Sequence, residues 1–503
     1  MTARCIMVLG TSSDAGKSWL VTALCRWYAR QGWRVAPFKA QNMSNNARVV
    51  AGGEIGSAQY FQALAAQSQP DVRMNPLLLK PESDTHSQVI LMGHANAPLG
   101  DVPWRERGQL VWPHITRALD DLRADHDLVI IEGAGSPCEI NLMDCDIVNL
   151  RVARHADARC LLVTDIDRGG AFAHLYGTWA LMPAADQQRL SGFVLNKFRG
   201  DAALLAPGPE QLKALTGVPT LAVLPLLLDH GLPQEDALPH LSPMVGVLSP
   251  GQANAAFQHW KPLNTPHPSA SVHMVIVAYP RISNHDEFQP LFQVPGLRVT
   301  WARTPQECDG ADVVVLPGSK HTSSDLVWLR RQGLDAVISR HAAQGRPVLG
   351  ICGGLQMLGE ALIDPHGIDG NAPGLGLLPI VTVFDPNKTV QLGRHTFSAL
   401  KGVWAALSQV SVTGYEIHHG QTQLHPAMVQ AGSTADEVLP GGLAWLNATG
   451  NVLGCYLHGL FENASVLQAL FGMAQSPLDQ AFDRLADCVQ QHMGVDALQS
   501  LMQ

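Results

Sequence analysis

Residues 10–20 read GTSSDAGKSWL, and this stretch decides the fold of the first half of the chain. It follows an apolar run, RCIMVLG, and leads into an amphipathic run, SWLVTALCRWYARQG. A strand, a glycine-rich turn and a helix in this order form a phosphate-binding loop, because backbone N–H groups and a helix N-terminus converge on an anion. Lys17 would then reach the β and γ phosphates, and the Ser18 hydroxyl would hold Mg²⁺. The alternative is a glycine turn that happens to precede Lys-Ser, and the flanking strand and helix favour the loop.

Beyond this loop, short apolar runs alternate with amphipathic stretches, which is typical of βαβ units around a parallel sheet. Single cores stop growing near about 250 to 300 residues, so a chain of 503 residues should form more than one domain. The sequence predicts an α/β fold with two doubly wound parallel-sheet domains. We expect the first over 1–230, a Pro- and His-rich linker over 231–270, the second over 271–465 and a helical tail over 466–503.

The composition excludes several classes of function. The net charge is −9 and no basic run is present, which argues against a nucleic-acid partner, because phosphate backbones recruit clustered Lys and Arg. No run of about 18 apolar residues occurs, so we expect no membrane span and no membrane partner. The nine cysteines are scattered without a C-x-x-C pair, which suits a reducing, cytoplasmic setting. The N-terminal apolar run is better explained as a first strand than as a signal peptide.

Acidic residues follow a buried strand in DLVIIEGAGSP, residues 127–137. Glu132 ends this strand at the edge where open α/β sheets bind ligands, so its carboxylate can complete a Mg²⁺ shell with Ser18 and phosphate oxygens. The alternative is a glutamate that caps the following glycine turn. Asp144 and Asp146, in NLMDCDIVN, come close to the same edge and can position a substrate or an acyl phosphate, or remain solvated in a loop. Asp146 is the predicted catalytic carboxylate.

A second site is predicted in RPVLGICGGLQMLGE, residues 346–360. Small residues two before and two after Cys352 permit the strained turn that lifts a nucleophile above a sheet. A cysteine at a helix N-terminus acts as a thiolate, and a thiolate nucleophile needs a base. The later stretch VLGCYLHGLFEN offers His458. A buried structural cysteine is the alternative, and the glycine frame favours the nucleophile.

Gly10 lies one residue early for the usual phosphate-loop spacing, and in this the loop resembles that of dethiobiotin synthetase and its amidoligase relatives. The resemblance implies that Lys39, in APFKAQNMS, lies near the transferred phosphate. It also implies that Glu54, in GGEIGSAQ, is a metal ligand, although relatives often have Asp there, and that Asn196, in GFVLNKF, reads the base. Arg199 replaces the Asp of the guanine signature, which favours ATP over GTP. The remaining nucleotide-binding residues belong to the loop: Thr11, Ser12, Asp14, Ala15, Gly16, Lys17 and Ser18.

The order Cys352 before His458 resembles that of class I glutamine amidotransferases. The resemblance implies an oxyanion hole made by the N–H groups of Gly353 and of the LPGSK turn at Gly318. That family usually continues His-x-Glu, whereas Leu460 stands at the acidic position here. The departure is similar to a subgroup in which Cys and His act without the third residue. The segment GYEIHHG also resembles that subgroup, and we expect it to be a structural strand.

Taken in chain order, the motifs resemble the cobyric acid synthase family, in which a phosphate-loop amidoligase domain is fused to a class I-type glutamine amidotransferase domain. The resemblance implies ATP, Mg²⁺ and glutamine as nitrogen donor. The implied substrate is a corrinoid small molecule, adenosylcobyrinic acid a,c-diamide, amidated at its b, d, e and g carboxylates through acyl phosphates. Cobyrinic acid a,c-diamide synthase is one alternative. A partition-type ATPase switch with an inactive amidotransferase domain is another, although such switches carry an extra lysine early in the loop. The oligomeric state is left open.

Overall fold

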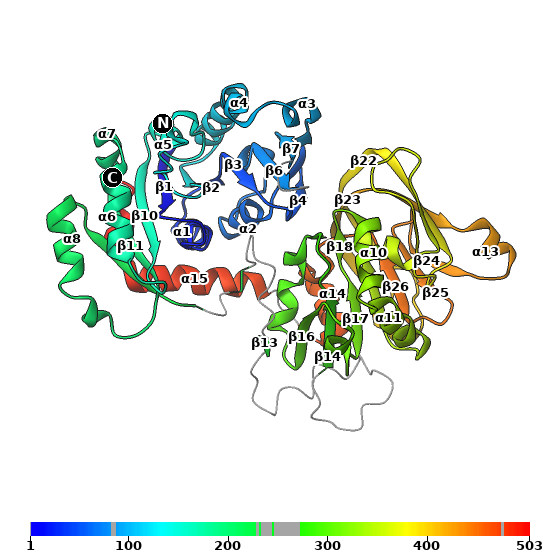
Figure 1. The fold of residues 1–503 in the computed structure, drawn as a ribbon. Helices are drawn as coiled ribbons and strands as arrows, with labels where there is room; N and C mark the ends of the chain where they lie inside the picture. Colours follow the sequence, from blue (N-terminus) through cyan, green and yellow to red (C-terminus); the bar gives the residue numbers. More distant parts are fainter. Residues whose placement is uncertain (1, 82–86, 228–230, 233–243, 246–271, 474–476) are drawn as a thin grey trace. The chain divides into compact units, whose positions relative to one another are not determined.

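The computed structural model describes residues 2–81, 87–227, 231–232, 244–245, 272–473 and 477–503. These residues form two compact units (Figure 1): residues 1–232 together with 478–503 make the first, and residues 233–477 make the second. Most of the linker expected over 231–270 lies outside the described residues. In the described part of the chain, no helix combines the length and the apolar character needed to cross a bilayer.

The first unit is built on a parallel sheet in the order β12–β11–β10–β1–β9–β2. Its register brings the predicted site residues to one edge. Val8 pairs with Glu132, and Ile131 pairs with Phe38, so Lys39 follows directly beside Glu132. The strands are β1 (Arg4–Gly10), β2 (Val35–Phe38), β9 (Leu128–Glu132), β10 (Arg159–Asp165), β11 (Leu190–Phe198) and β12 (Thr220–Pro225).

Both faces of this sheet are buried, which explains why its strands are continuous apolar runs. Along β1, Met7 and Leu9 pack on one face with α4 (Trp104–Asp125), while Ile6 and Val8 pack on the other. Two helices from opposite ends of the chain cover that second face, α1 (Lys17–Arg30) and α15 (Pro477–Met493) (Figure 1). This two-sided burial confirms the doubly wound class expected for the first domain.

Between β2 and β9 the chain forms small sheets that the sequence pattern did not reveal. One has the order β3–β6–β7–β8, and the other pairs β4 with β5. The elements are β3 (Gln41–Met43), β4 (Ala47–Val50), β5 (Gly53–Gly56), α2 (Ser57–Ala65), β6 (Leu77–Pro81), β7 (Ser87–Leu91) and β8 (His94–Ala95). Within this region, Gln62 of α2 contacts Glu132 at the edge of the main sheet, where Lys39 also contacts it.

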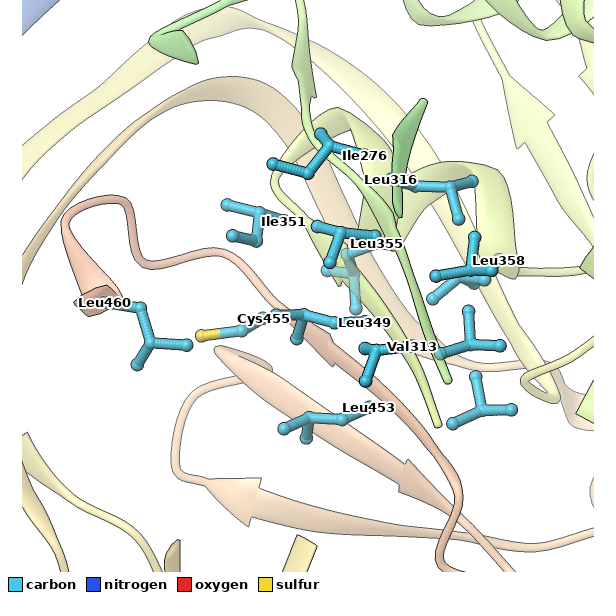
Figure 2. Packing of buried hydrophobic residues seen from close by; sticks show 14 of the residues in the cluster. Ile276, Val313, Leu316, Leu349, Ile351, Leu355, Leu358, Leu453, Cys455 and Leu460 are labelled. Atoms are coloured by element: carbon cyan, nitrogen blue, oxygen red, sulfur yellow. The ribbon is translucent and has the colours of Figure 1, made fainter. Parts of the chain in front are cut away.

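The second unit contains a sheet in the order β13–β16–β14–β17–β19–β26–β25–β24, whose strands from β16 to β26 are parallel. Figure 2 shows part of its core, where side chains of β17, β19 and β26 meet Leu355 and Leu358 of α12 (Gly353–Leu358). The doubly wound class expected for this domain is confirmed as well. The strands are β13 (Met244–Val245), β14 (Val272–Val277), β16 (Leu297–Ala302), β17 (Val313–Leu316), β19 (Val348–Ile351), β24 (Ala435–Leu439), β25 (Ala444–Asn447) and β26 (Val452–Cys455).

A smaller sheet, β21–β20–β22–β23, completes the second unit, and the GYEIHHG segment lies within β23 as expected for a strand. Of the C-terminal residues, α14 (Ala464–Phe471) packs in the second unit, whereas α15 and α16 (Val495–Ser500) belong to the first. The strands are β15 (Ile282–Ser283), β18 (Gly318–Ser319), β20 (Ala361–Ile363), β21 (Ala372–Pro373), β22 (Ile380–Thr396) and β23 (Ser411–Leu424). The other α-helices are α3 (Ala97–Gly100), α5 (Leu150–Ala156), α6 (Ala171–Leu181), α7 (Ala184–Gln187), α8 (Gly208–Thr216), α10 (Thr322–Arg331), α11 (Leu334–Ala343), α12 (Gly353–Leu358) and α13 (Pro426–Gln430).

Candidate active sites

The phosphate loop connects the end of β1 to the start of α1. Gly16 has φ 99°, a left-handed conformation that glycine adopts without strain. The Lys17 ammonium donates to the Ser12 carbonyl at 2.9 Å and to the Gly135 carbonyl at 3.2 Å, so its side chain folds back over the loop. A Cβ at Gly10 would lie 2.9 Å from Nζ of Lys17. The early glycine therefore leaves the space that the lysine occupies.

Side chains from neighbouring strands brace the loop. The Thr11 hydroxyl donates to the Thr164 hydroxyl at 2.9 Å, and Nδ2 of Asn196 donates to the Ala15 carbonyl at 3.0 Å. Asp14 has φ 58° and contacts Lys197 through both its backbone carbonyl and its carboxylate. The structure thus brings Asn196 to the loop, where one of its donors supports the loop backbone. That it reads a base remains a prediction.

Glu132 joins the predicted residues of the first site. One carboxylate oxygen accepts from the Ser18 hydroxyl at 2.9 Å and contacts the Lys39 ammonium at 2.9 Å, and the other accepts from Gln62 at 2.5 Å. Burial by itself would raise the pKa of this carboxyl. The charge of Lys39, hydrogen bonds from Lys39 and Gln62, and the charge of Lys17 hold the pKa below its usual range instead. Glu132 is 1% exposed, and its lowered pKa favours the ionised carboxylate.

Two predicted residues have other partners. Glu54, on β5, is fully buried and forms an ion pair with Lys80 of β6. Asp146 accepts the backbone N–H groups of Val148, Asn149 and Arg151, and so caps the start of α5. Neither makes a described hydrogen bond or ion pair with Ser18 or Glu132. The neighbouring Asp144 pairs with Arg105 on the surface.

The Ser18 hydroxyl and the Glu132 carboxylate are hard oxygen donors of the kind that Mg²⁺ binds. Among the described residues, no group of three or more His, Cys, Asp or Glu side chains could hold a metal ion. Phosphate oxygens and water can supply further ligands of an ion at Ser18, as is usual for Mg²⁺ in nucleotide sites. The donor set fits the expected ion.

The second site centres on Cys352, which lies between β19 and α12 with φ 51° and ψ −105°. Such a left-handed backbone is strained for a non-glycine residue. Close packing enforces the turn: a Cβ at Gly354 would lie 1.9 Å from the Leu316 carbonyl, and one at Gly350 would lie 2.7 Å from the carbonyl of Gly354. The glycine frame that the sequence suggested for a nucleophile is therefore required by contacts on both sides of Cys352.

The predicted oxyanion residues and His458 lie next to this turn. A Cβ at Gly353 would lie 2.7 Å from the backbone N of Ser319, and a Cβ at Gly318 would lie 2.8 Å from Cε1 of His458. His458 is fully buried, and burial alone would lower its pKa. The charges of Glu287 and of Cys352 outweigh burial and raise the pKa to about 10. The raised pKa favours the protonated form of the imidazole beside Cys352.

Sequence reasoning missed two partners of His458. Glu287, 171 residues earlier in the chain, accepts from Nδ1 of His458 at 2.9 Å. Tyr415 exchanges backbone hydrogen bonds with His458 and stacks on its ring, with the ring centroids 5.2 Å apart. The expectation of a histidine without an acidic partner therefore differs from the structure. The signal in the sequence was a polar run, NHDE, directly after β15, but no spacing rule relates it to His458.

Two family models match the chain. Residues 6–232 match a CobQ/CobB/MinD/ParA nucleotide binding domain, and residues 273–466 match a CobB/CobQ-like glutamine amidotransferase domain. The first match contains the phosphate loop and Glu132, and the second contains Cys352, His458 and Glu287. Each sequence match therefore covers one of the two sites described above.

Curated relatives match over the full length. A cobyric acid synthase of Variovorax paradoxus is 66% identical, with 100% of each chain covered. A cobyric acid synthase of a Polaromonas species is 64% identical over 99% of this chain and 98% of its own. Among solved structures, a glutamine amidotransferase aligns with 42% of this chain and 98% of its own at 14% identity, with a TM-score of 0.29. That score is low, and the relatives in sequence define the family.

Proposed function

The chain belongs to the cobyric acid synthase family, and from this premise we propose that it amidates corrinoid carboxylates with nitrogen from glutamine and energy from ATP. It is an amide-forming ligase with a nucleotide-binding domain and a glutamine amidotransferase domain. We propose adenosylcobyrinic acid a,c-diamide as the substrate and its b, d, e and g carboxylates as the positions amidated. The chemistry runs through an acyl phosphate, and the cytoplasm is the proposed compartment.

Glutamine hydrolysis is assigned to the second unit. We propose that Sγ of Cys352 attacks the side-chain amide carbon of glutamine and that His458 gives a proton to the departing ammonia. The resulting thioester is hydrolysed by water with His458 as base, which releases glutamate. The N–H groups of Gly353 and of the turn at Gly318 are placed to stabilise the oxyanion. The contacts around Cys352 support this assignment.

Carboxylate activation is assigned to the first unit. We propose that Thr11, Ser12, Asp14, Ala15, Gly16, Lys17 and Ser18 bind the nucleotide phosphates and that Asn196 contacts the base. Lys39 would stabilise charge on the phosphoryl group that passes to the substrate carboxylate, and ammonia then displaces phosphate. Ser18 and Glu132 would hold Mg²⁺, which neutralises phosphate charge when bound. Glu54 and Asp146 remain proposed as a metal ligand and a catalytic carboxylate, and both have structural partners as well.

The observation that carries this proposal is the contact of Glu132 with both Ser18 and Lys39 at the phosphate loop. This contact brings together Glu132, the proposed metal ligand, and Lys39, the proposed phosphoryl-binding lysine. The same chain also has Cys352, the proposed nucleophile, at a strained turn. Either site alone would make an ATPase or a glutaminase, whereas together they make a glutamine-dependent amide ligase.

Two variants test the assignment of the sites. Cys352→Ala should abolish amidation driven by glutamine and leave amidation driven by ammonium chloride, because ammonia bypasses the thioester. Lys17→Ala should stop amidation from either nitrogen source while glutamine hydrolysis continues. The readout is mass spectrometry of corrinoid products with MgATP, because each amidation replaces a hydroxyl with an amino group and lowers the mass. Loss of ammonia-driven synthesis in Cys352→Ala would contradict the separation of the two sites.

The substrate is tested by presenting two corrinoids in parallel. We expect amidation of the a,c-diamide at four further carboxylates. Amidation of cobyrinic acid itself, without reaction of the a,c-diamide, would favour a cobyrinic acid a,c-diamide synthase. If glutamine is hydrolysed and corrinoid amides form, the alternative of an ATPase switch with an inactive amidotransferase domain is excluded.

A further inference from the structure

We propose that Glu287 is the positioning residue of the glutaminase site: it orients His458 and stabilises its charged form, and so completes a Cys352–His458–Glu287 arrangement. The inference rests on the proposed glutaminase role of Cys352 and His458. Glu287 is an acidic residue of the site that could not be found from the residues that follow His458.

The geometry of Glu287 is specific for a histidine held in one orientation. Oε1 accepts from Nδ1 of His458 at 2.9 Å, and Oε2 accepts the backbone N–H of Gly459 at 2.9 Å. Both side chains are fully buried, so water does not compete for these hydrogen bonds. With Nδ1 occupied as a donor, Nε2 is left to exchange a proton with the thiol of Cys352. Nε2 has no hydrogen-bond partner of normal geometry among the described residues, and the Cys352 thiol lies close enough to affect the imidazole.

Glu287 is supplied from outside the histidine's own segment. It belongs to the short 3-10 helix His285–Gln293, and the next residue, Phe288, is fully buried between the rings of Trp301 and Phe461. Leu460, at the position where class I amidotransferases usually carry the acid, is buried among apolar side chains instead. The carboxylate beside the imidazole therefore comes from the 3-10 helix His285–Gln293 and not from the residues that follow His458.

The charge of Glu287 has a direct chemical consequence. When the thiol gives its proton to Nε2, the imidazolium that forms is buried, and an isolated buried cation is costly. A carboxylate on Nδ1 offsets that cost and keeps the proton available for the departing ammonia. The same logic fixes the tautomer, since a carboxylate can only accept from Nδ1–H.

A neutral amide cannot reproduce both contacts. In Glu287→Gln, the single carbonyl oxygen can accept either from Nδ1 or from the N–H of Gly459, and the NH₂ group then faces the other donor. One of the two N–H donors then faces an NH₂ group instead of an acceptor, and the negative charge of the carboxylate is lost. Within the described ranges of the chain, the titratable groups near the imidazole are Glu287, Cys352 on the turn before α12, Tyr415 of β23 and, next to Gly459, Glu462. Glu287 is the carboxylate among them that contacts the ring.

The experiment compares full-length Glu287→Gln, Glu287→Asp and Glu462→Gln with the parent chain. Glu462→Gln is the matched control, because Glu462 is partly exposed and lies three residues after Gly459. Glutamine hydrolysis is measured from pH 6 to pH 11, and ammonia-driven amidation of the corrinoid serves as the test of folding. We expect Glu287→Gln to lower kcat for glutamine hydrolysis by roughly 10²-fold or more. Without the carboxylate, the imidazolium of His458 is less stabilised and loses its proton at lower pH. The alkaline fall of kcat/KM should therefore begin at a lower pH than in the parent chain.

The outcomes separate a positioning role from a structural one. Glu287→Asp keeps the charge, so we expect it to restore most of the alkaline limb with a partial loss of kcat, and Glu462→Gln should match the parent chain. If Glu287→Gln keeps the rate and pH profile of the parent, the inference is wrong. It is also wrong if the rate falls without a shift of the alkaline limb and Glu287→Asp gives no recovery. If Glu287→Gln does not fold, folded Glu287→Asp decides. A rate and an alkaline pH dependence like those of the parent chain support a role for the negative charge. A loss of glutamine hydrolysis as large as that of Cys352→Ala overturns the inference. A parent chain without glutaminase activity would instead overturn the proposed function.

Discussion

At the scale of single residues, the ionised state of the Glu132 carboxylate depends on the charge of Lys39. A buried carboxylate without a partner would carry a raised pKa, and here the neighbouring cation reverses that direction. Its stabilising contribution is present above the ordinary glutamate pKa of about 4.3 and is lost as the pH falls through the lower folded-state value. Under the proposed function, the same contact would keep the Glu132 carboxylate ionised for the metal and hold the Lys39 ammonium near the phosphoryl group.

We expect Lys39→Met to destabilise the first unit by about 3–5 kcal/mol at pH 7, because it leaves Glu132 buried and unpaired. In the variant, burial then raises the pKa of Glu132. The penalty should therefore shrink as the pH falls from 7 to 5 and the carboxyl takes up a proton. Urea unfolding at several pH values checks this, with Lys39→Arg as the charge-preserving control. A difference that stays constant with pH would contradict the pairing.

Asp146 allows a structural role and a catalytic role to be separated. Asp146→Asn keeps a side-chain oxygen for the backbone N–H groups at the start of α5, so we expect the free energy of unfolding to change by less than about 1 kcal/mol. If the carboxylate also acts on the substrate, ammonia-driven amidation should fall by roughly tenfold or more. Parallel measurements of unfolding and amidation decide this, and full activity in Asp146→Asn would leave Asp146 as a cap alone.

At the scale of elements, α12 can start only if its first residues lack side chains. Gly354 packs against the β17 carbonyl of Leu316, and the turn before it forces Cys352 into a left-handed conformation. The close approach of helix and strand therefore constrains the backbone at Cys352, the proposed nucleophile. If Cys352 acts as proposed, core packing and catalytic geometry depend on the same contacts.

Two helical glycines test that constraint with one substitution. Gly354→Ala places a Cβ 1.9 Å from a backbone carbonyl, so we expect a loss of about 1–3 kcal/mol or more, together with loss of glutamine hydrolysis. Gly177→Ala, in α6, has no atom within 4 Å of the added Cβ and should stabilise by roughly 0.5–1 kcal/mol. Denaturant unfolding and glutaminase assays on both variants provide the comparison. Equal effects in the two variants would mean that close packing at Gly354 is not the cause.

At the scale of the whole molecule, the chain returns to its first unit at the C-terminus. Phe482, Leu485 and Val489 of α15 pack in the same core as Leu20 and Leu24 of α1. Trp27 and Tyr28 of α1 also donate to Gln490 and to the Leu498 carbonyl. The helix that begins at the phosphate loop is thus covered by residues that come after the entire second unit.

We expect Phe482→Ala to destabilise the first unit by about 3–5 kcal/mol, because it empties a fully buried ring from the α1–α15 contact. ATP-dependent amidation should then be lost at a lower temperature than in the parent chain, whereas glutamine hydrolysis by the second unit should be lost at an unchanged temperature. The control is Asp487→Ala, which removes the exposed 2.7 Å ion pair with Arg30 and should cost less than about 1 kcal/mol. Equal shifts of both activities in Phe482→Ala would contradict the assignment of α15 to the first unit.

Sequence reasoning found the elements whose signal is local. The strand, turn and helix at 4–30 and the glycine frame of Cys352 each occupy a few consecutive residues, so dihedral preferences and burial period suffice to predict them. It missed the small sheets that follow Lys39, because their strands are short and separated by polar turns. It also missed Glu287, because no local pattern in residues 281–293 indicates a contact with His458, 171 residues later in the chain.

The sequence by itself therefore determined the two doubly wound domains, the phosphate loop with Lys17 and Ser18, and the nucleophile turn at Cys352. Only the tertiary structure decided which buried charges meet: Lys39 with Glu132, Lys80 with Glu54, and His458 with Glu287. The physical reason is range. Backbone conformation and apolar periodicity are properties of neighbours in the chain, whereas a buried ion pair depends on sheet register and on loops that bring distant residues together.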